Sequence, residues 1–250
     1  MKILGIIPSR FASTRFPGKP LAMINGKTMI QRVYQQAKQA ESLQKVVVAT
    51  DDNRIYDHVK DFDGAVVMTS AKHQNGTSRC AEVIEILESS MPETKFDVVV
   101  NIQGDEPYIH PLQIDTVAGI FNDNEAEIGT LVKKITSEKE LTNPNVVKVV
   151  FTNRRLALYF SRQPIPFFRD VPADEWINQR DFYKHIGIYG YRTAVLKKLS
   201  GLPVGELETA EKLEQLRWLE NGYPIKVEIT DFESIAVDTP KDLLKFNNNS

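Results

Sequence analysis

The sequence predicts an α/β fold with a doubly wound, mostly parallel sheet and an inserted, partly antiparallel layer. Strand-like and helix-like segments alternate through the first half of the 250-residue chain. The strand-like segments are continuous apolar runs, which are typical of parallel strands that helices cover on both faces. The second half has more strand candidates and fewer helices. We therefore expect a single domain over residues 1–250, with the inserted layer at about 146–192.

Four apolar strands are expected in the first half, at residues 3–7, 45–50, 65–69 and 97–102. Between them, apolar residues recur at helical spacing. The expected helices are residues 28–40, a short one through Ile55 and Val59, 77–89 and 111–121. Thr28 is suited to cap the first helix, because its hydroxyl accepts a backbone N–H. Asn25-Gly26 marks a tight turn before that helix.

The second half is more mixed. Strand candidates are residues 127–135, 146–151, 156–160, 184–192 and 225–229. A helix is expected at about 208–220 and a short last one at about 240–246. Because the chain contains no linker-like or repeated segment, these elements are assigned to the same domain as the first half.

Charge is distributed unevenly along the chain. The whole chain has 31 Lys and Arg against 33 Asp and Glu, a net charge of −2, which argues against nucleic acid as a partner. The first forty residues, however, contain no acidic residue and seven basic ones: Lys2, Arg10, Arg15, Lys19, Lys27, Arg32 and Lys38. This concentration of positive charge indicates an anionic ligand near the N-terminus.

Two chemical classes are excluded early. The single Cys80 rules out an internal disulfide or a cysteine-based zinc site, and its place in a predicted amphipathic helix favours a buried residue over a nucleophile. No apolar run reaches about 18 residues, so no membrane span or membrane partner is expected. The apolar run after Met1-Lys2 is too short for a secretion signal, and we expect a cytoplasmic protein.

A basic loop follows the first strand, at the edge where open α/β sheets bind ligands. It carries Arg10, Arg15 and Lys19 with the hydroxyls of Ser13 and Thr14. Arginine forks match phosphate oxygens and lysine adds a compact charge, so a triphosphate is a suitable guest. The loop has neither the glycine pattern of dinucleotide-binding folds nor that of P-loop enzymes. The alternative is an ordinary solvated basic loop.

This loop, R-x-x-S-T-R-x-P-G-K-P, resembles the signature loop of sugar nucleotidylyltransferases, which implies their type of Rossmann-like fold. Six further motifs follow in order, at residues 73–79, 101–107, 160–166, 185–192, 213–217 and 237–240. Together they resemble the family of 3-deoxy-manno-octulosonate (Kdo) cytidylyltransferases over residues 2–246. The family reaction joins CMP from CTP to the anomeric hydroxyl of Kdo and releases pyrophosphate, for lipopolysaccharide biosynthesis. The resemblance also implies a homodimer through part of the inserted layer.

Asp105 and Asp238 each follow an apolar strand segment near the carboxyl edge of the expected sheet. The resemblance implies that they hold Mg²⁺, which usually takes one or two carboxylates together with substrate phosphates. From spacing alone, both could instead be turn or cap residues. Glu106 is left out of the expected metal ligands, because the alternation of side chains turns it away from Asp105.

The resemblance also implies the CTP site. The residues expected to contact CTP are Pro8, Ser9, Arg10, Ser13, Arg15, Lys19, Thr69, Gly76, Arg79, Gln103 and Asp105. Those expected to act in catalysis are Arg10, Arg15, Lys19, Asp105 and Asp238. The cations would hold the phosphates and offset charge on the leaving pyrophosphate.

The expected sugar site is Gln103, Arg162, His185, Tyr189, Glu214 and Gln215. His185 and Tyr189 are four residues apart on one predicted strand and therefore share a face. A polyhydroxylated acid needs a cation for its carboxylate and polar groups for its hydroxyls, and this set supplies both. The alternatives are that His185 and Tyr189 belong to the core and that Glu214 is a solvated helix carboxylate.

Three rival functions stay open at this point. A sialic acid cytidylyltransferase would share fold and chemistry, although residues 160–166 and 185–192 speak against it. An enzyme for another base would keep the basic loop. A non-catalytic nucleotide-binding module would not need Asp105 and Asp238, yet both are present within their motifs.

Overall fold

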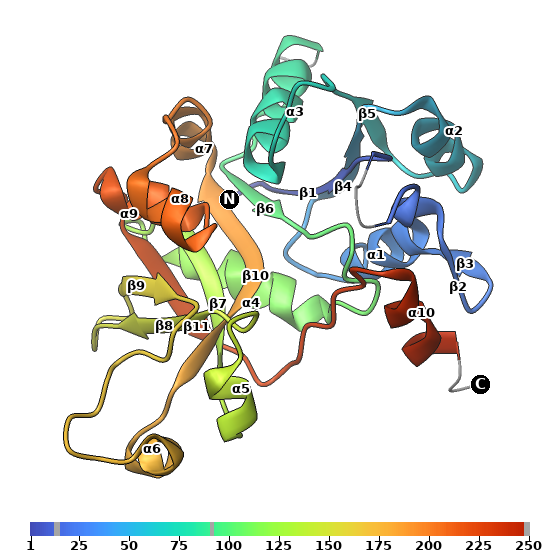
Figure 1. The fold of residues 1–250 in the computed structure, drawn as a ribbon. Coiled ribbons are helices and arrows are strands. Elements are labelled where there is room, and N and C mark those ends of the chain that lie inside the picture. The colour runs from blue at the N-terminus through green and yellow to red at the C-terminus, as the bar shows by residue number, and fades with distance from the viewer. Residues whose placement is uncertain (13–15, 91–92, 248–250) are drawn as a thin grey trace.

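The computed structural model describes residues 1–12, 16–90 and 93–247. Its centre is one open sheet of nine strands with helices on both faces (Figure 1). The main path of this sheet runs in the order β11 (Ile225–Ile229), β7 (Ile128–Lys134), β10 (Tyr183–Arg192), β6 (Val98–Asn101), β1 (Ile3–Ser9), β4 (Lys45–Thr50) and β5 (Val66–Met68). The α/β class expected from the sequence is confirmed.

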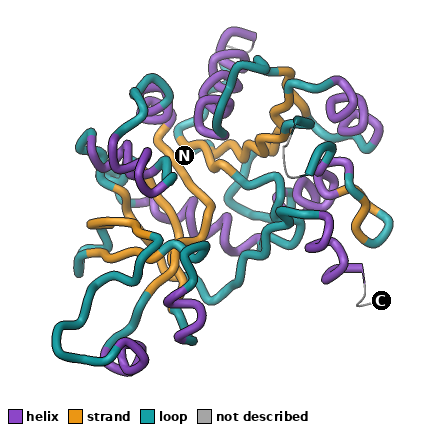
Figure 2. The backbone as a smooth tube through the Cα atoms, viewed as in Figure 1, coloured by secondary structure: helices purple, strands orange, loops and turns teal. Residues whose placement is uncertain are grey.

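Parallel pairing joins β6, β1, β4 and β5, and separately β11 with β7. The exception is β10, which lies in the middle of the sheet and runs antiparallel to both β6 and β7. Beyond it, β8 (Lys148–Phe151) pairs with β10 and with β9 (Ala157–Ser161), also antiparallel. Residues 146–192 therefore add their strands to the same sheet, which Figure 2 shows as a continuous band of strands.

The helices of the described residues cover the sheet from two sides. They are α1 (Met29–Ala37), α2 (Asn53–Asp61), α3 (Gly76–Ser90), α4 (Pro111–Gly119), α5 (Glu138–Thr142), α6 (Trp176–Gln179), α7 (Thr193–Leu199), α8 (Glu206–Glu211), α9 (Gln215–Glu220) and α10 (Pro240–Asn247). Three short 3₁₀ helices and a small hairpin complete the fold: η1 (Lys19–Leu21), η2 (Ile120–Asn122), η3 (Ala173–Glu175), and β2 (Met23–Ile24) with β3 (Lys27–Thr28).

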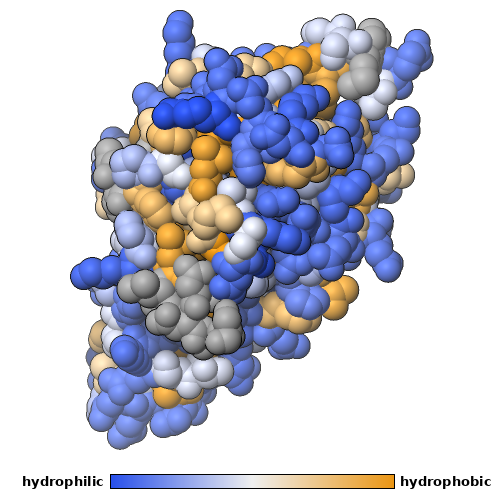
Figure 3. All heavy atoms as spheres, turned by 90° about the vertical axis from the view of Figure 1, so that its right-hand side faces the viewer, coloured by the Kyte–Doolittle hydropathy of each residue, from blue (hydrophilic) through white to orange (hydrophobic). Residues whose placement is uncertain are grey.

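Two large cores lie on the two faces of the sheet. Alternation along β1 sends Leu4 and Ile6 into the core under α3 and α7, and Ile3 and Ile7 into the core under α1, α2 and α4. All four side chains are nearly or completely buried. Because both faces of β1 are buried, its residues are apolar throughout and do not alternate with polar ones. The face of the molecule seen in Figure 3, apart from the atoms drawn in grey, is mostly hydrophilic.

Several local predictions are confirmed in detail. The Thr28 side chain accepts a hydrogen bond from Gln31 N, as the predicted cap of α1. Asn25 and Gly26 both have positive φ, 43° and 79°, in the turn between β2 and β3. Cys80 is buried, and burial raises the pKa of its thiol.

One helix prediction is wrong. The segment expected as a single helix at 208–220 forms two helices, α8 and α9, with a break between them. Lys212 ends α8 in the left-handed conformation with φ 55°, and Leu213 then turns into the core. The described part of the chain has no helix with the length and apolar character needed to cross a bilayer.

Candidate active site

A pocket opens at the carboxyl ends of β1 and β6, next to the first turn of α3. The residues that line it are Pro8, Ser9, Arg10, Lys19, Pro20, His73, Gln74, Asn75, Gly76, Arg79, Gln103, Gly104 and Asp105. Eight of the residues expected to contact CTP are among them. Thr69 lies behind the pocket, bonded to Arg79. Ser13 and Arg15, which were expected here too, lie outside the described residues.

The backbone of the basic loop positions Lys19. Gly18 N donates to Phe11 O at 3.0 Å and closes the loop. Gly18 has φ 71°, a left-handed conformation that a side chain would strain, and it directly precedes η1. The Lys19 side chain then points back across the pocket, where only 15% of it is exposed.

Lys19 brings together the two carboxylates that were expected to bind metal. Its Nζ lies 2.8 Å from Asp105 Oδ2 and 3.6 Å from Asp238 Oδ1. The same ammonium donates to Val237 O at 2.8 Å. Asp105 follows β6, whereas Asp238 lies in an irregular segment nine residues beyond the end of β11. A main-chain hydrogen bond from Val237 N to Asp105 O, at 2.9 Å, joins the two segments and brings the carboxylates together.

The two carboxylates fit a divalent cation that also binds substrate phosphates. A positive group, the Lys19 ammonium, already lies within reach of both. Both Asp side chains stay partly open, at 28% and 44% exposure. No group of three or more His, Cys, Asp or Glu suited to a metal occurs within residues 1–12, 16–90 and 93–247. Two carboxylates leave the rest of a divalent cation's coordination shell to water and substrate phosphates.

Close packing holds Asp105 in place. A Cβ on the preceding Gly104 would lie 2.7 Å from Pro8 O, so a larger residue would push β6 and β1 apart at the pocket. The next residue, Glu106, turns the other way and is buried, at 6% exposure. Burial raises the pKa of Glu106 to about 7, and its Oε1 would lie 3.8 Å from a Cβ on Gly187. The sequence analysis expected Glu106 to turn away from Asp105, but its burial was not expected, because burial depends on the tertiary fold.

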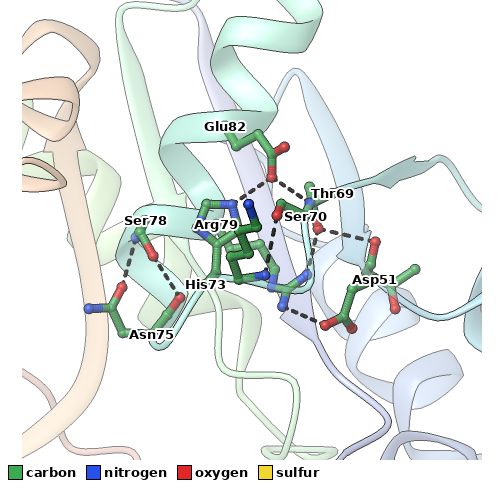
Figure 4. A network of polar contacts seen from close by, with 10 residues as sticks. Asp51, Thr69, Ser70, His73, Asn75, Ser78, Arg79 and Glu82 are labelled. Carbon is green, nitrogen blue, oxygen red and sulfur yellow. Dashed lines mark hydrogen bonds and ion pairs between the residues drawn. The ribbon is translucent and has the colours of Figure 1, made fainter.

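The far wall of the pocket is a polar network (Figure 4). Arg79 is 3% exposed, and its guanidinium donates to Thr69 Oγ1 at 2.5 Å and to Asp51 Oδ2 at 3.1 Å. Thr69 and Asp51 follow β5 and β4, so one side chain of α3 ties two strand ends together. The role of Asp51 was not expected, since nothing in its local sequence marks it.

The expected sugar residues on β10 lie close together. The ring centroids of His185 and Tyr189 are 5.1 Å apart, although a register shift falls between Ile186 and Tyr189. His185 Nε2 is 2.9 Å from Thr130 Oγ1. Burial lowers the pKa of His185 to about 3, so the ring is neutral, and burial also raises the pKa of the Tyr189 hydroxyl.

Glu214 and Gln215 lie at the start of α9. Burial raises the pKa of Glu214 to about 7, while the nearby Thr77 hydroxyl acts to lower it. The charge of Glu214 also acts to raise the pKa of Tyr189, after the larger effect of burial. Gln215 is 5% exposed. Glu214 is thus half-buried at the start of α9 rather than fully exposed.

Arg162 is placed differently from the other sugar candidates. Its Nε donates to Glu211 O at 2.7 Å and its Nη1 to Pro144 O at 3.0 Å. Its backbone N donates to Glu211 Oε2 at 2.9 Å. Arg162 thus connects the end of β9 to α8, and its guanidinium is engaged by main-chain carbonyls.

An open α/β sheet with a basic loop after β1 and two carboxylates beside Lys19 defines a nucleotidyltransferase fold and site. The family model described as cytidylyltransferase matches residues 4–234. The chain is 55% identical over 249 residues to the 3-deoxy-manno-octulosonate cytidylyltransferase of Parabacteroides distasonis, covering 98% of this chain and 96% of the relative. The enzyme of that name from Bacteroides thetaiotaomicron is 54% identical, with 97% and 96% covered.

A solved structure agrees with these relatives. CMP:2-keto-3-deoxy-manno-octonic acid synthetase, solved in complex with CTP, superposes with a TM-score of 0.89 at 40% identity and covers 99% of this chain and 98% of that one. The chain belongs to the cytidylyltransferases, and within them to the family of 3-deoxy-manno-octulosonate cytidylyltransferases.

Proposed function

We propose that this chain transfers CMP from CTP to the anomeric hydroxyl of Kdo, giving CMP-Kdo and pyrophosphate. The observation that carries the proposal is the meeting of Lys19, Asp105 and Asp238 at one point of a pocket that Arg10 and Arg79 also line. This arrangement matches what a nucleoside triphosphate and its cation require. A role in lipopolysaccharide biosynthesis is part of the proposal, through the names of the relatives.

The nucleotide would lie with its triphosphate along the basic loop. Arg10 and Lys19 would bind phosphate oxygens, together with Arg15 and Ser13 of the segment outside the described residues. Arg79, Gly76 and Gln103, with the backbone at Pro8 and Ser9, would hold the cytidine end. Thr69 contributes through Arg79, to which it is bonded.

Asp105 and Asp238 would hold Mg²⁺, whose chemistry when bound is to neutralise phosphate charge and to lower the pKa of the attacking hydroxyl. Lys19 is bonded to Asp105 in the structure, and would turn its ammonium toward the phosphates when CTP is bound. In that position it would offset charge on the leaving pyrophosphate. The described residues therefore supply both the carboxylates and the counter-charge.

The reaction is a displacement at the α-phosphorus. The anomeric oxygen forms a new bond to phosphorus as the bond to pyrophosphate breaks, and the hydroxyl loses its proton. Such chemistry depends mainly on positioning and charge stabilisation. His185, Tyr189, Glu214, Gln215 and Gln103 would position the sugar.

Arg162 is proposed for the sugar site with a specific condition. Its guanidinium donates to Glu211 O and Pro144 O, so direct contact with the sugar carboxylate would require it to exchange one of these bonds. If it keeps them, it serves the site by holding β9 against α8. In either case its removal would disturb sugar binding more than CTP binding.

We also propose that two copies associate through the layer at about 146–192. Two large apolar side chains of this layer are open to solvent: Leu158 at 61% and Phe167 at 76% exposure. Apolar groups this exposed are suited to an interface.

We also propose that the chain acts in the cytoplasm, because the reaction consumes CTP.

The test is pyrophosphate release with CTP, Mg²⁺ and a panel of sugar acids. We expect release with Kdo, and little with a sialic acid or when UTP or GTP replaces CTP. Release that prefers sialic acid or another nucleotide would replace the proposal with one of the rival enzymes. Binding of CTP without turnover on any sugar acid would favour the non-catalytic module.

A further inference from the structure

His73 lies on the loop between β5 and α3 and has a side chain that lines the nucleotide pocket. Its Nε2 is 2.6 Å from Glu82 Oε2, on the second turn of α3 (Figure 4). The same carboxylate oxygen accepts from Ser70 N at 2.8 Å. The His73 side chain is 18% exposed. Neither His73 nor Glu82 belongs to the CTP contacts proposed above.

These contacts set the orientation of the imidazole ring. A carboxylate only accepts hydrogen bonds, so the proton between the two groups belongs to His73 Nε2. Glu82 is not among the residues that line the pocket, and it occupies Nε2, so Nδ1 is the ring nitrogen left for a ligand. A carboxylate behind a histidine is a common way to hold the ring and its tautomer in place for binding. Because Ser70 N anchors Glu82, the ring is oriented before a ligand arrives.

The position of His73 indicates which part of the nucleotide it meets. Arg79 and Glu82 are three residues apart and share one face of α3. Arg79 is bonded to Asp51 and Thr69, which follow β4 and β5. Asp105, the proposed site of the reacting phosphate, follows β6, on the other side of β1. His73 therefore stands at the end of the pocket away from the reacting phosphate.

We propose that His73, oriented by Glu82, is a further nucleotide-contacting residue, which hydrogen-bonds the nucleoside half of the triphosphate through Nδ1. Glu82 is its positioning residue. The inference rests on the proposed binding of CTP. The alternative is that the pair only ties the loop at residues 70–75 to α3. A tie of that kind affects stability, whereas a ligand contact changes when CTP binds.

The experiment measures CTP binding by calorimetry, without sugar, for the wild-type chain and three variants. We expect His73→Ala to weaken CTP binding about tenfold, the usual effect of losing one good hydrogen bond. Glu82→Gln keeps the shape of the side chain but removes its charge, and should weaken CTP binding less than His73→Ala does. Lys72→Ala is the matched control, because Lys72 is an exposed neighbour on the same loop, and its affinity should stay within about twofold of wild type.

A spectroscopic measurement on the wild-type chain avoids any folding defect of the variants. The chain has four histidines, so the ¹⁵N signals of the His73 imidazole can be assigned by comparison with His73→Ala. Adding CTP should shift the Nδ1 signal, because that nitrogen gains a partner. A signal that is the same with and without saturating CTP would overturn the inference.

Analogues separate the nucleoside from the phosphates. The loss caused by His73→Ala should shrink with 2′-deoxy-CTP if the contact is to the ribose, or with UTP if it is to the base. An equal loss for inorganic tripolyphosphate would place the contact on the phosphates and overturn the inference, as would equal CTP affinity of His73→Ala and wild type. If the wild-type chain binds no CTP, the proposed function fails instead.

Discussion

Val237 N donates a hydrogen bond to Asp105 O at 2.9 Å. This main-chain contact joins the segment after β6 to the segment before α10, at the pocket. Asp238, the next residue, is thereby brought within 3.6 Å of Lys19 Nζ, which also bonds Asp105. A backbone bond is insensitive to side-chain changes, so substitutions at either carboxylate should leave this geometry in place and change mainly its charge.

Lys19→Ala should lower kcat/KM by about two to three orders of magnitude, because it removes a positive charge aimed at the developing charge of the leaving group. Steady-state kinetics of pyrophosphate release measures this. Lys27→Ala is the control, since Lys27 is an exposed cation of the same acid-free region and lies outside the pocket. Turnover close to wild type in Lys19→Ala would remove this role from Lys19.

Asp105→Asn and Asp238→Asn should each raise the Mg²⁺ concentration needed for half-maximal activity, because an amide oxygen binds Mg²⁺ less well than a carboxylate. A Mg²⁺ titration at saturating CTP measures the shift. Glu233→Gln is a comparison, as it removes an acidic group that pairs with Lys133 and Lys184 instead. An unchanged Mg²⁺ requirement in both Asp variants would show that the metal lies elsewhere.

His185→Ala should raise KM for Kdo far more than KM for CTP, because His185 lies beside Tyr189 and outside the nucleotide pocket. The two Michaelis constants, measured with the other substrate saturating, give the comparison. A rise in KM for CTP of equal size would instead indicate that the substitution disturbs the whole sheet.

His185 also makes a prediction about pH. Its pKa is lowered in the folded chain to about 3, from 6.5, so between these values the unfolded chain binds the extra proton. The contribution of the neutral His185 ring to the free energy of unfolding is therefore complete above pH 6.5 and is lost as the pH falls toward 3. Denaturation of wild type and His185→Gln should show their difference in unfolding free energy changing by about 2 kcal/mol between pH 7 and pH 5. A constant difference would mean that the ring titrates normally in the folded chain.

Glu214→Gln should separate stability from function. The pKa of Glu214 is raised in the folded chain from 4.5 to about 7, so between these values the unfolded chain gives up its proton first. The free energy of unfolding therefore falls as the pH rises from 4.5 and levels off above about 7. The variant does not show this fall and should gain about 2 kcal/mol of unfolding free energy relative to wild type between pH 5 and pH 8. Its KM for Kdo should rise. A variant that is no more stable at pH 8 and binds Kdo normally would place Glu214 in solvent.

Lys148→Met should destabilise the chain by about 3 kcal/mol, since it leaves buried carbonyls without a donor. The Lys148 ammonium donates to Asn143 O at 2.9 Å and Val146 O at 2.6 Å, and also to Arg162 O. Chemical denaturation measures the loss. Lys139→Met, on the exposed surface of α5, should change stability little. Equal stabilities of the two variants would mean that water replaces the Lys148 ammonium at no cost.

Local sequence patterns predicted much of the fold because they act over a few residues. The apolar run of β1 and the Thr28 cap of α1 depend on neighbours in the chain, and both are confirmed. The break at Lys212 was not predicted; the left-handed conformation of Lys212 and the burial of Leu213 are seen only in the folded structure. Arg10 and Lys19 line the pocket as predicted, because they belong to a basic loop that directly follows a strand. The contacts of Asp51 and Glu82 were not predicted, because no local sequence pattern marks these two residues.

The sequence by itself determined the α/β class, the basic loop after the first strand and the family motifs, since each is a local arrangement of residue types. Only the tertiary structure decided that β10 runs antiparallel through the middle of the sheet. It also decided that Lys19 meets Asp238, that Glu214 is half-buried and that Arg162 bonds main-chain carbonyls. These are contacts between distant segments. They arise when apolar faces are buried together, and a single chain read residue by residue does not contain that geometry.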